Sequence, residues 1–192
     1  MNDCLIVFAK EPKGGEVKTR LQSDLSQDTC VKLYKAFLKD TFKLVRAIQC
    51  FDMVLAYESS VPEPRYLKTI ARDFIFYKQK GRDLGEKMHD AFKYAKGLNY
   101  EKVIIIGSDS PNLPALYIKD AFKRLDENDI VLGPSHDGGY YLIGLKEPCL
   151  EIFKRVQWSS KTTREDTVKN ARRLEKKLLS SIHGMMWMNS PG

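Results

Sequence analysis

The feature that most constrains the fold is an alternation of short apolar runs with intervals long enough to hold a helix. Five runs have the length and the β-branched or aromatic content typical of buried strands, and they cover 4–9, 53–57, 74–77, 103–106 and 130–132. Helical patterns predict helices at 27–48, 64–72, 84–96, 114–127 and 163–179. The alternation predicts an α/β fold with a mostly parallel central sheet and helices on both faces.

The remaining segments complete this outline. After 130–132 a turn-rich stretch leads into 140–145, which should re-enter the sheet, with an antiparallel direction as one option. Pro114 suits a first helical turn, and Thr163 with Asp166 is typical of a capping box. Since there are no repeats and no linker, residues 1–192 are expected to form a single domain.

Composition excludes several classes of protein. A hydrophobic fraction of 43% with 30% charged residues is ordinary for a globular protein and excludes a disordered chain. No apolar run approaches the length of a membrane span, and the first run has no basic region before it, so neither a membrane span nor a secretory signal is expected. The cysteines form no CxxC pair, which indicates a reducing, cytoplasmic location. They are Cys4, Cys30, Cys50 and Cys149.

The net charge of +7 suggests an acidic partner, such as nucleic acid, an anionic membrane surface or a phosphorylated small molecule. The densest basic stretch, 161–177, surrounds Val168, Ala171 and Leu174 at helical spacing. That spacing predicts an amphipathic helix whose charges lie in water. No motif typical of nucleic-acid recognition occurs, so a nucleic-acid partner is not expected.

Ligands of open α/β sheets lie at the carboxyl ends of the strands, so the loops there are the candidates for function. The first loop carries Lys10, Lys18 and Arg20 beside Gly14 and Gly15. Glycines let backbone amides approach a phosphate, while lysine and arginine supply positive charge. By composition alone, a phosphate-binding loop and an ordinary basic turn are equally favoured.

The loop after 103–106 begins with Ser108 and Asp109. A carboxylate at the end of a strongly buried strand is costly unless a cation meets it, so Asp109 is predicted to hold Mg²⁺ or Mn²⁺. The alternative is that Asp109 caps the turn that follows, because aspartate commonly does so.

The loop after 130–132 contains Asp137 followed by Gly138 and Gly139. The glycines allow unusual backbone conformations or a close approach to a ligand. Asp137 could be a second metal ligand or a general base. An Asp-Gly hairpin turn is the alternative, since this dipeptide is a strong turn signal.

A fourth candidate segment, 81–88, lies between the third predicted strand and a helix. Asp83, with the backbone of Leu84 and Gly85, could contact a ribose or the edge of a base. The simpler interpretation is that Asp83 caps the helix.

Together these segments resemble a known family, the glycosyltransferase-like transferases of GT-A fold within the nucleotide-diphospho-sugar transferase superfamily. This family is also described as a domain of unknown function and as radical-SAM/selenodomain-associated transferases. The resemblance covers residues 5–167 through FAKEPKGGEVKTRL, LYKAFLKD, QKGRDLGEKM, IIIGSDSPNLP, LGPSHDGGYYLIGL and, more weakly, VQWSSKTTREDT. It implies a metal-dependent transferase with a GT-A-like sheet.

The resemblance also implies roles for individual residues. The loop with Lys18 and Arg20 would face the nucleotide phosphates and take part in catalysis, Asp109 would hold the metal, and Asp137 would lie beside the reacting group. The implied nucleotide-binding set also includes Lys10, Gly14, Gly15, Asp83, Leu84, Gly85, Ser108, Gly138 and Gly139.

The chain departs from the family pattern at a few positions. Gly14 stands where the family usually has proline, Lys87 where it has arginine, and Ser160 where threonine follows WS. The chain ends in HGMMWMNSPG, where the family has an aspartate-rich segment.

Three functions fit these residues. The first is glycosyl transfer from a nucleotide-diphospho-sugar to an unidentified small-molecule acceptor, favoured by the family description. The second is nucleotidyl transfer from a nucleoside triphosphate, favoured by the single Asp109 and the lysine-rich first loop. The third is nucleotide binding without catalysis.

Overall fold

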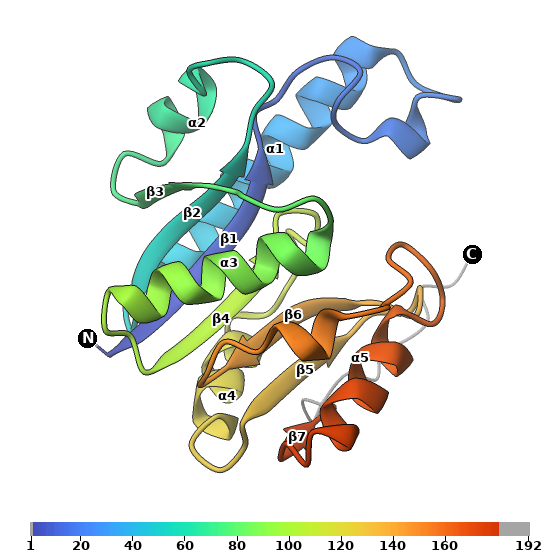
Figure 1. Cartoon of the computed structure of the whole chain (residues 1–192). Coiled ribbons are helices and arrows are strands. Elements are labelled where there is room, and N and C mark those ends of the chain that lie inside the picture. Colours follow the sequence, from blue (N-terminus) through green and yellow to red (C-terminus); the bar gives the residue numbers. More distant parts are fainter. Residues whose placement is uncertain (1, 181–192) are drawn as a thin grey trace.

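A computed structural model of the chain describes residues 2–180. Seven strands form one sheet in the order β3-β2-β1-β4-β6-β5-β7 (Figure 1). The strands are β1 Asp3–Lys10, β2 Asp52–Glu58, β3 Ile75–Lys78, β4 Lys102–Gly107, β5 Ile130–Pro134, β6 Tyr140–Leu145 and β7 Leu178–Leu179. The helices are α1 Gln27–Arg46, α2 Arg65–Ile70, α3 Leu84–Gly97, α4 Ala115–Arg124 and α5 Thr163–Arg173, with 3₁₀ turns η1 Thr19–Leu21 and η2 Leu150–Phe153.

The sheet is mostly parallel, as the sequence predicts. Strand β1 lies between β2 and β4 and is parallel to both, and β2 is parallel to β3. Strand β6 is inserted between β4 and β5 and is antiparallel to both, so it does return to the sheet in the antiparallel sense. The fold is therefore the predicted α/β type.

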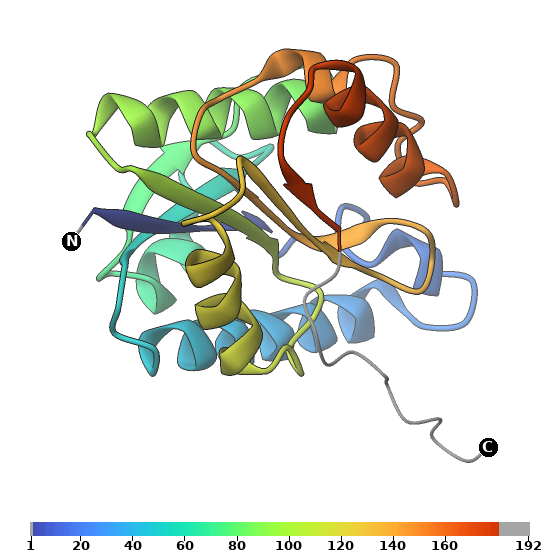
Figure 2. The ribbon, with the colours of Figure 1, turned by 90° about the horizontal axis from the view of Figure 1, so that it is seen from below.

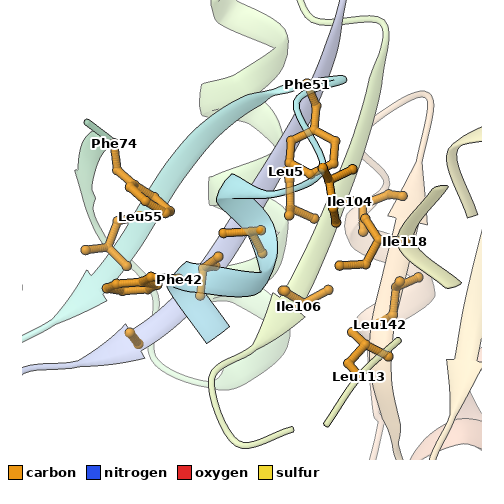
Figure 3. Close-up of a cluster of buried hydrophobic side chains, with 14 of the residues drawn as sticks. Leu5, Phe42, Phe51, Leu55, Phe74, Ile104, Ile106, Leu113, Ile118 and Leu142 are labelled. Carbon is orange, nitrogen blue, oxygen red and sulfur yellow. The ribbon is translucent and has the colours of Figure 1, made fainter. Parts of the chain in front are cut away.

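Helices cover both faces of the sheet, with α3 and α5 on one side and α1 and α4 on the other (Figure 2). Successive side chains of a strand point to opposite faces, which divides the core into two clusters. Leu5, Leu55 and Ile104 pack with α1, α2 and α4 (Figure 3). Their neighbours in the strands, such as Ile6 and Ile105, pack with α3 and α5 instead. The continuous apolar runs of β1, β4 and β5 thus belong to strands buried on both faces, whereas the edge strand β3 leaves Ile75 exposed.

The last predicted helix is too long. Helix α5 ends at Arg173, after which Glu175 adopts a left-handed φ of 53°. The next residues leave the helix and form β7, which pairs in parallel with β5 at Ile130 and Val131. Pairing with the open edge of β5 satisfies backbone groups of a strand far away in sequence, which the helical spacing of 163–179 could not indicate.

The start of α5 also differs from the expectation. Its N-cap is Thr162, whose side chain makes no hydrogen bond to the helix amides, so the predicted capping box of Thr163 and Asp166 is wrong. The Asp166 carboxylate instead accepts hydrogen bonds from the Gln157 amide and the Thr162 hydroxyl. Pro114 lies at the N-cap of α4, one position before its expected place in the first turn.

Two further expectations concern membrane spans and the cysteines. Among the described helices, none is both long and apolar enough to cross a membrane. All four cysteines are free thiols, with Cys4 and Cys30 buried. The atypical C-terminal tail, 183–192, lies outside the described residues.

Candidate active site

A pocket of about 800 Å³ opens at the carboxyl ends of β1 and β4. The chain runs outward from β1 through β2 to β3 and places β4 on the other side of β1, so this is the switch point in strand order where open sheets bind ligands. The lining includes Phe8, Lys10, Glu16, Lys18, Arg20, Tyr34, Glu58, Gln79, Leu84, Lys87, Ser108, Asp109 and Ser159.

Lys18 and Asp109 form the pair that joins the first loop to the end of β4. The Lys18 Nζ lies 2.8 Å from the Asp109 Oδ1, and it also lies 4.4 Å from the centre of the Phe37 ring. The Lys18 side chain is only 14% exposed, whereas that of Asp109 is 67% exposed. The expectation of a desolvated Asp109 is therefore wrong, because β4 ends at Gly107 and Asp109 projects beyond the core. Its charge is balanced by an ammonium group rather than left uncompensated.

A second ionic cluster lies in the lining of the same pocket. The Glu58 Oε2 at the end of β2 lies 3.1 Å from the Lys87 Nζ and 3.6 Å from the Lys10 Nζ. Strand β3 ends close by, and Gln79 beyond it donates from its side chain to the Ala56 carbonyl at 2.8 Å. The pocket lining therefore carries a small excess of positive charge, with four lysine or arginine side chains and three carboxylates.

Tyr34 of α1 holds the two central strand ends together. Its hydroxyl accepts a hydrogen bond from the Lys10 amide at 2.8 Å and shares one with the Ser108 hydroxyl at 3.0 Å. Burial raises the pKa of Tyr34 to about 12. Ser108 is itself buried, so this buried chain of hydrogen bonds fixes the floor of the pocket.

Glu11, in the matched segment FAKEP, has a structural role. Its carboxylate accepts hydrogen bonds from the amides of Tyr66 and Leu67, the first free donors of α2. Because those amides have no partner within the helix, the carboxylate stabilises the start of α2. The segment after β1 is thereby anchored to the segment after β2.

Asp137 lies at the tip of the hairpin that joins β5 and β6. Its Oδ1 accepts hydrogen bonds from the Ser135 hydroxyl and, at 3.1 Å, from the Gly139 amide. The bond from Ser135 does most to hold the pKa of the Asp137 carboxyl below its usual range, and the Arg20 guanidinium acts in the same direction. The turn alternative is thus confirmed, and the carboxylate also lies within the electrostatic reach of the first loop.

Gly138, beside Asp137, serves packing. Gly138 has a φ of 87°, and a Cβ there would lie 2.1 Å from the Lys161 carbonyl oxygen. The Gly138 carbonyl accepts from the Arg164 amide at 2.9 Å. The hairpin tip therefore docks on the loop before α5, and Gly138 is required by that contact.

At the start of α3, Asp83 and Gly85 likewise have structural roles. Asp83 caps the helix by accepting from the Glu86 amide at 2.8 Å, which confirms the capping alternative. A Cβ on Gly85 would lie 2.6 Å from Trp158 and 2.7 Å from Phe153, so Gly85 makes room for these side chains. Of this segment, Leu84 is the residue that lines the pocket.

About half of the site residues predicted from the sequence line the pocket. Lys10, Lys18, Arg20, Leu84, Ser108 and Asp109 line the pocket. The lining does not include Gly14, Gly15, Asp83, Gly85, Asp137, Gly138 and Gly139. Gly15 has a φ of 80° and no atom within 4 Å of an added Cβ, so it serves the turn.

Several lining residues were missed, among them Glu58, Gln79 and Ser159. Glu58 ends β2 and Gln79 directly follows β3, so the rule that ligands lie at strand ends could have found both. Ser159 comes from a turn between η2 and α5, within the segment VQWSSKTTREDT that matches the family only weakly.

The described residues supply only some of the ligands that a divalent metal ion needs. Within residues 2–180, no group of three or more His, Cys, Asp or Glu side chains converges as a metal site. Asp109 is an exposed carboxylate at the pocket, and Mg²⁺ is commonly held by one or two carboxylates together with substrate phosphates. The residues therefore fit a metal that also binds phosphate oxygens.

The fold has counterparts among solved structures. A crystal structure of a candidate nucleotide-diphospho-sugar transferase from Desulfovibrio desulfuricans G20 is 32% identical in sequence, with a TM-score of 0.85 over 93% of this chain and 79% of that one. The CMP:2-keto-3-deoxy-manno-octonic acid synthetase complexed with CTP has a TM-score of 0.57 over 93% of this chain and 88% of that one. At 6% identity, it shares the fold alone.

Curated relatives carry a different activity in their names. The 2-phospho-L-lactate guanylyltransferase of Methanobrevibacter smithii is 28% identical over 68% of this chain, and that of Methanocaldococcus jannaschii is 28% identical over 72%. The matched part spans only 57% and 58% of those proteins, respectively.

A family profile also matches residues 41–160, more than half of the chain. This segment contains strands β2 to β6, and with them Glu58, Gln79, Asp109 and Asp137. The chain therefore belongs to the family described as uncharacterized proteins conserved in bacteria, DUF2064, and has the fold of the nucleotide-diphospho-sugar transferases.

Proposed function

We propose that this protein is a metal-dependent nucleotidyltransferase. An acceptor oxygen would attack the α-phosphorus of a nucleoside triphosphate, the bond from that phosphorus to the bridging oxygen of the β-phosphate would break, and pyrophosphate would leave. The observation that carries this proposal is the pocket at the ends of β1 and β4, where Lys18 and Arg20 lie with Asp109. The positive charges of Lys18 and Arg20 would offset the negative charge of a triphosphate.

The named relatives support nucleotidyl over glycosyl transfer, which reverses the order expected from the sequence. Four curated relatives are guanylyltransferases by name. Sugar transfer remains the second candidate, because the 32% identical solved structure is named for a nucleotide-diphospho-sugar transferase.

Three residues of the pocket are proposed to bind the phosphates and the metal ion. Lys18 and Arg20 would bind the triphosphate oxygens, and Asp109 would hold Mg²⁺ or Mn²⁺ together with those oxygens. When bound, the metal would neutralise phosphate charge as the pyrophosphate departs. The Lys18 ammonium now lies against Asp109, so it would turn from the carboxylate toward the phosphates on binding.

Asp137 is better suited to remain charged than to accept a proton. A general base works best with a pKa near the working pH, whereas hydrogen bonds from Ser135 and Gly139 hold the pKa of Asp137 low. We therefore assign Asp137 to orient Arg20 or to serve as a second metal ligand. An acceptor whose attacking oxygen is already ionised, such as a phosphate, would need no base.

The first experiment measures which nucleotides bind. Thermal unfolding would be followed with GTP, CTP, UTP and ATP, and with UDP- and GDP-sugars, each with and without Mg²⁺ or Mn²⁺. A ligand that binds the native state raises the melting temperature. Metal-dependent stabilisation by one triphosphate supports the proposal, whereas stabilisation by a sugar nucleotide alone would support glycosyl transfer.

The second experiment measures turnover. The preferred triphosphate would be incubated with Mg²⁺ and 2-phospho-L-lactate, the acceptor for which the curated relatives are named, and with other phosphorylated acids. Released pyrophosphate and the mass of the product would be determined. Binding without product from any acceptor or sugar donor would favour a non-catalytic nucleotide-binding module.

A further inference from the structure

Among the residues that line the pocket at the ends of β1 and β4, Ser159 is the one that comes from the C-terminal third of the described chain. Its backbone has a φ of 59°, in the left-handed region that non-glycine residues seldom adopt. Across residues 2–180, its hydroxyl makes no hydrogen bond, although the hydroxyls of Ser160, Thr162 and Thr163 all do. A strained residue with a free polar group in a pocket is a candidate for ligand contact.

The surrounding turn is built to hold this conformation. The Thr163 and Ser160 hydroxyls both donate to the Gln157 carbonyl, at 2.7 and 2.8 Å, and the Asp166 carboxylate accepts from the Gln157 amide at 3.2 Å. These bonds brace the residues on either side of Ser159 and leave its own side chain unused.

Two packing contacts fix where the turn lies. Trp158 occupies the space above Gly85 at the first turn of α3, where an added Cβ would be 2.6 Å from its ring. At the other end, the Lys161 backbone packs on Gly138 of the β5–β6 hairpin. Ser159 is therefore held between the start of α3 and the hairpin tip that carries Asp137.

The charge of the pocket indicates which part of a nucleotide would reach this position. Lys18, Arg20 and Asp109 form the side that suits phosphates and a metal. On the side of the pocket formed by the start of α3, Leu84 is apolar, and the charge of Lys87 is paired with Glu58. A nucleotide whose phosphates lie at the charged side would place its uncharged nucleoside here.

We propose that the Ser159 hydroxyl binds a ribose hydroxyl of the donor nucleotide, with Trp158 on Gly85 as the contact that positions it. The proposal rests on the nucleotidyltransferase function proposed above and adds a residue that distinguishes ribose from deoxyribose.

The test is the variant Ser159→Gly, with Gln49→Gly as the matched control. Glycine adopts the left-handed conformation without strain, so both variants should unfold at the same or a higher temperature than the parent. Gln49 has a φ of 51° but lies before β2, at the opposite end of the strands from the pocket. Binding of GTP, 2′-deoxy-GTP and 3′-deoxy-GTP with Mg²⁺ would be measured by calorimetry, with the CTP series used if the parent protein prefers CTP.

The parent and Gln49→Gly should bind one deoxy analogue about 3- to 10-fold more weakly than the ribonucleotide, as expected for one lost neutral hydrogen bond. Ser159→Gly should bind the ribonucleotide about 3- to 10-fold more weakly and no longer distinguish it from that analogue. A ribose preference that persists in Ser159→Gly, or is absent from the parent, overturns the proposal. Failure of the parent to bind any triphosphate overturns the proposed function instead, so the two failures are distinguishable.

Discussion

The hydrogen bonds of Tyr34 provide the sharpest test of how the pocket is held together. Tyr34→Phe removes one oxygen and leaves the ring in the core between α1 and the sheet. The change deprives the Lys10 amide of its acceptor at 2.8 Å and the Ser108 hydroxyl of its partner at 3.0 Å.

The expected loss of stability follows from these contacts. Because the ring remains, no large cavity forms, and the cost is that of leaving buried polar groups without partners. Such a group costs about 1–3 kcal/mol. For a protein of this size, 2 kcal/mol corresponds to a fall in melting temperature of roughly 4–8 °C.

The measurement is urea and thermal unfolding of the variant beside the control Tyr57→Phe. The Tyr57 ring packs edge-on against Phe76, and within the described part of the chain its hydroxyl makes no hydrogen bond. The control removes the same atom and should change the unfolding free energy by less than about 0.5 kcal/mol. Equal effects in the two variants would refute the reasoning that Tyr34 fixes the ends of β1 and β4.

Three other predictions concern the site and the pH dependence. Asp109→Asn should abolish metal-dependent stabilisation by nucleotide and Asp137→Asn should keep most of it; equal loss in calorimetric titrations would show that both carboxylates hold the metal. Arg20→Ala should weaken triphosphate binding by about 1.5–3 kcal/mol at nearly unchanged melting temperature, and an unchanged dissociation constant would remove Arg20 from the phosphate site. Burial raises the pKa values of Cys4 and Tyr34 to about 12. Since the unfolded chain releases these protons at lower pH, stability should be fully present below about pH 9 and fall as pH rises to 12, and a flat unfolding free energy across that window would contradict the burial of both groups.

Much of the fold is encoded locally. A strand buried on both faces needs a continuous apolar run, and a helix covering it needs apolar residues every three or four positions, so both patterns are visible in the sequence. Strand ends place the following loops on one edge of a parallel sheet. The sequence therefore predicts that Lys18, Arg20 and Asp109 lie close together.

Contacts between distant segments were decided only by the tertiary structure. Strand β7 forms because β5 has an open edge, although the spacing of Leu174 and Leu178 indicates a helix. Gly85 and Gly138, which suggest ligand-binding backbone in the sequence, are required by the side chain of Trp158 and the backbone of Lys161. A glycine signals only that space is needed, and the neighbour that needs it can come from anywhere in the chain.

The same limit applies to the charges of the site. The sequence determined that Asp109 follows a buried strand, but its 67% exposure and its pairing with Lys18 depend on how far the chain projects beyond Gly107. Ser159 enters the pocket through packing on α3, a segment about seventy residues earlier. Local pattern determines which elements form because hydrogen bonding and burial within an element repeat with its period, whereas the partners of a side chain are set by packing between elements.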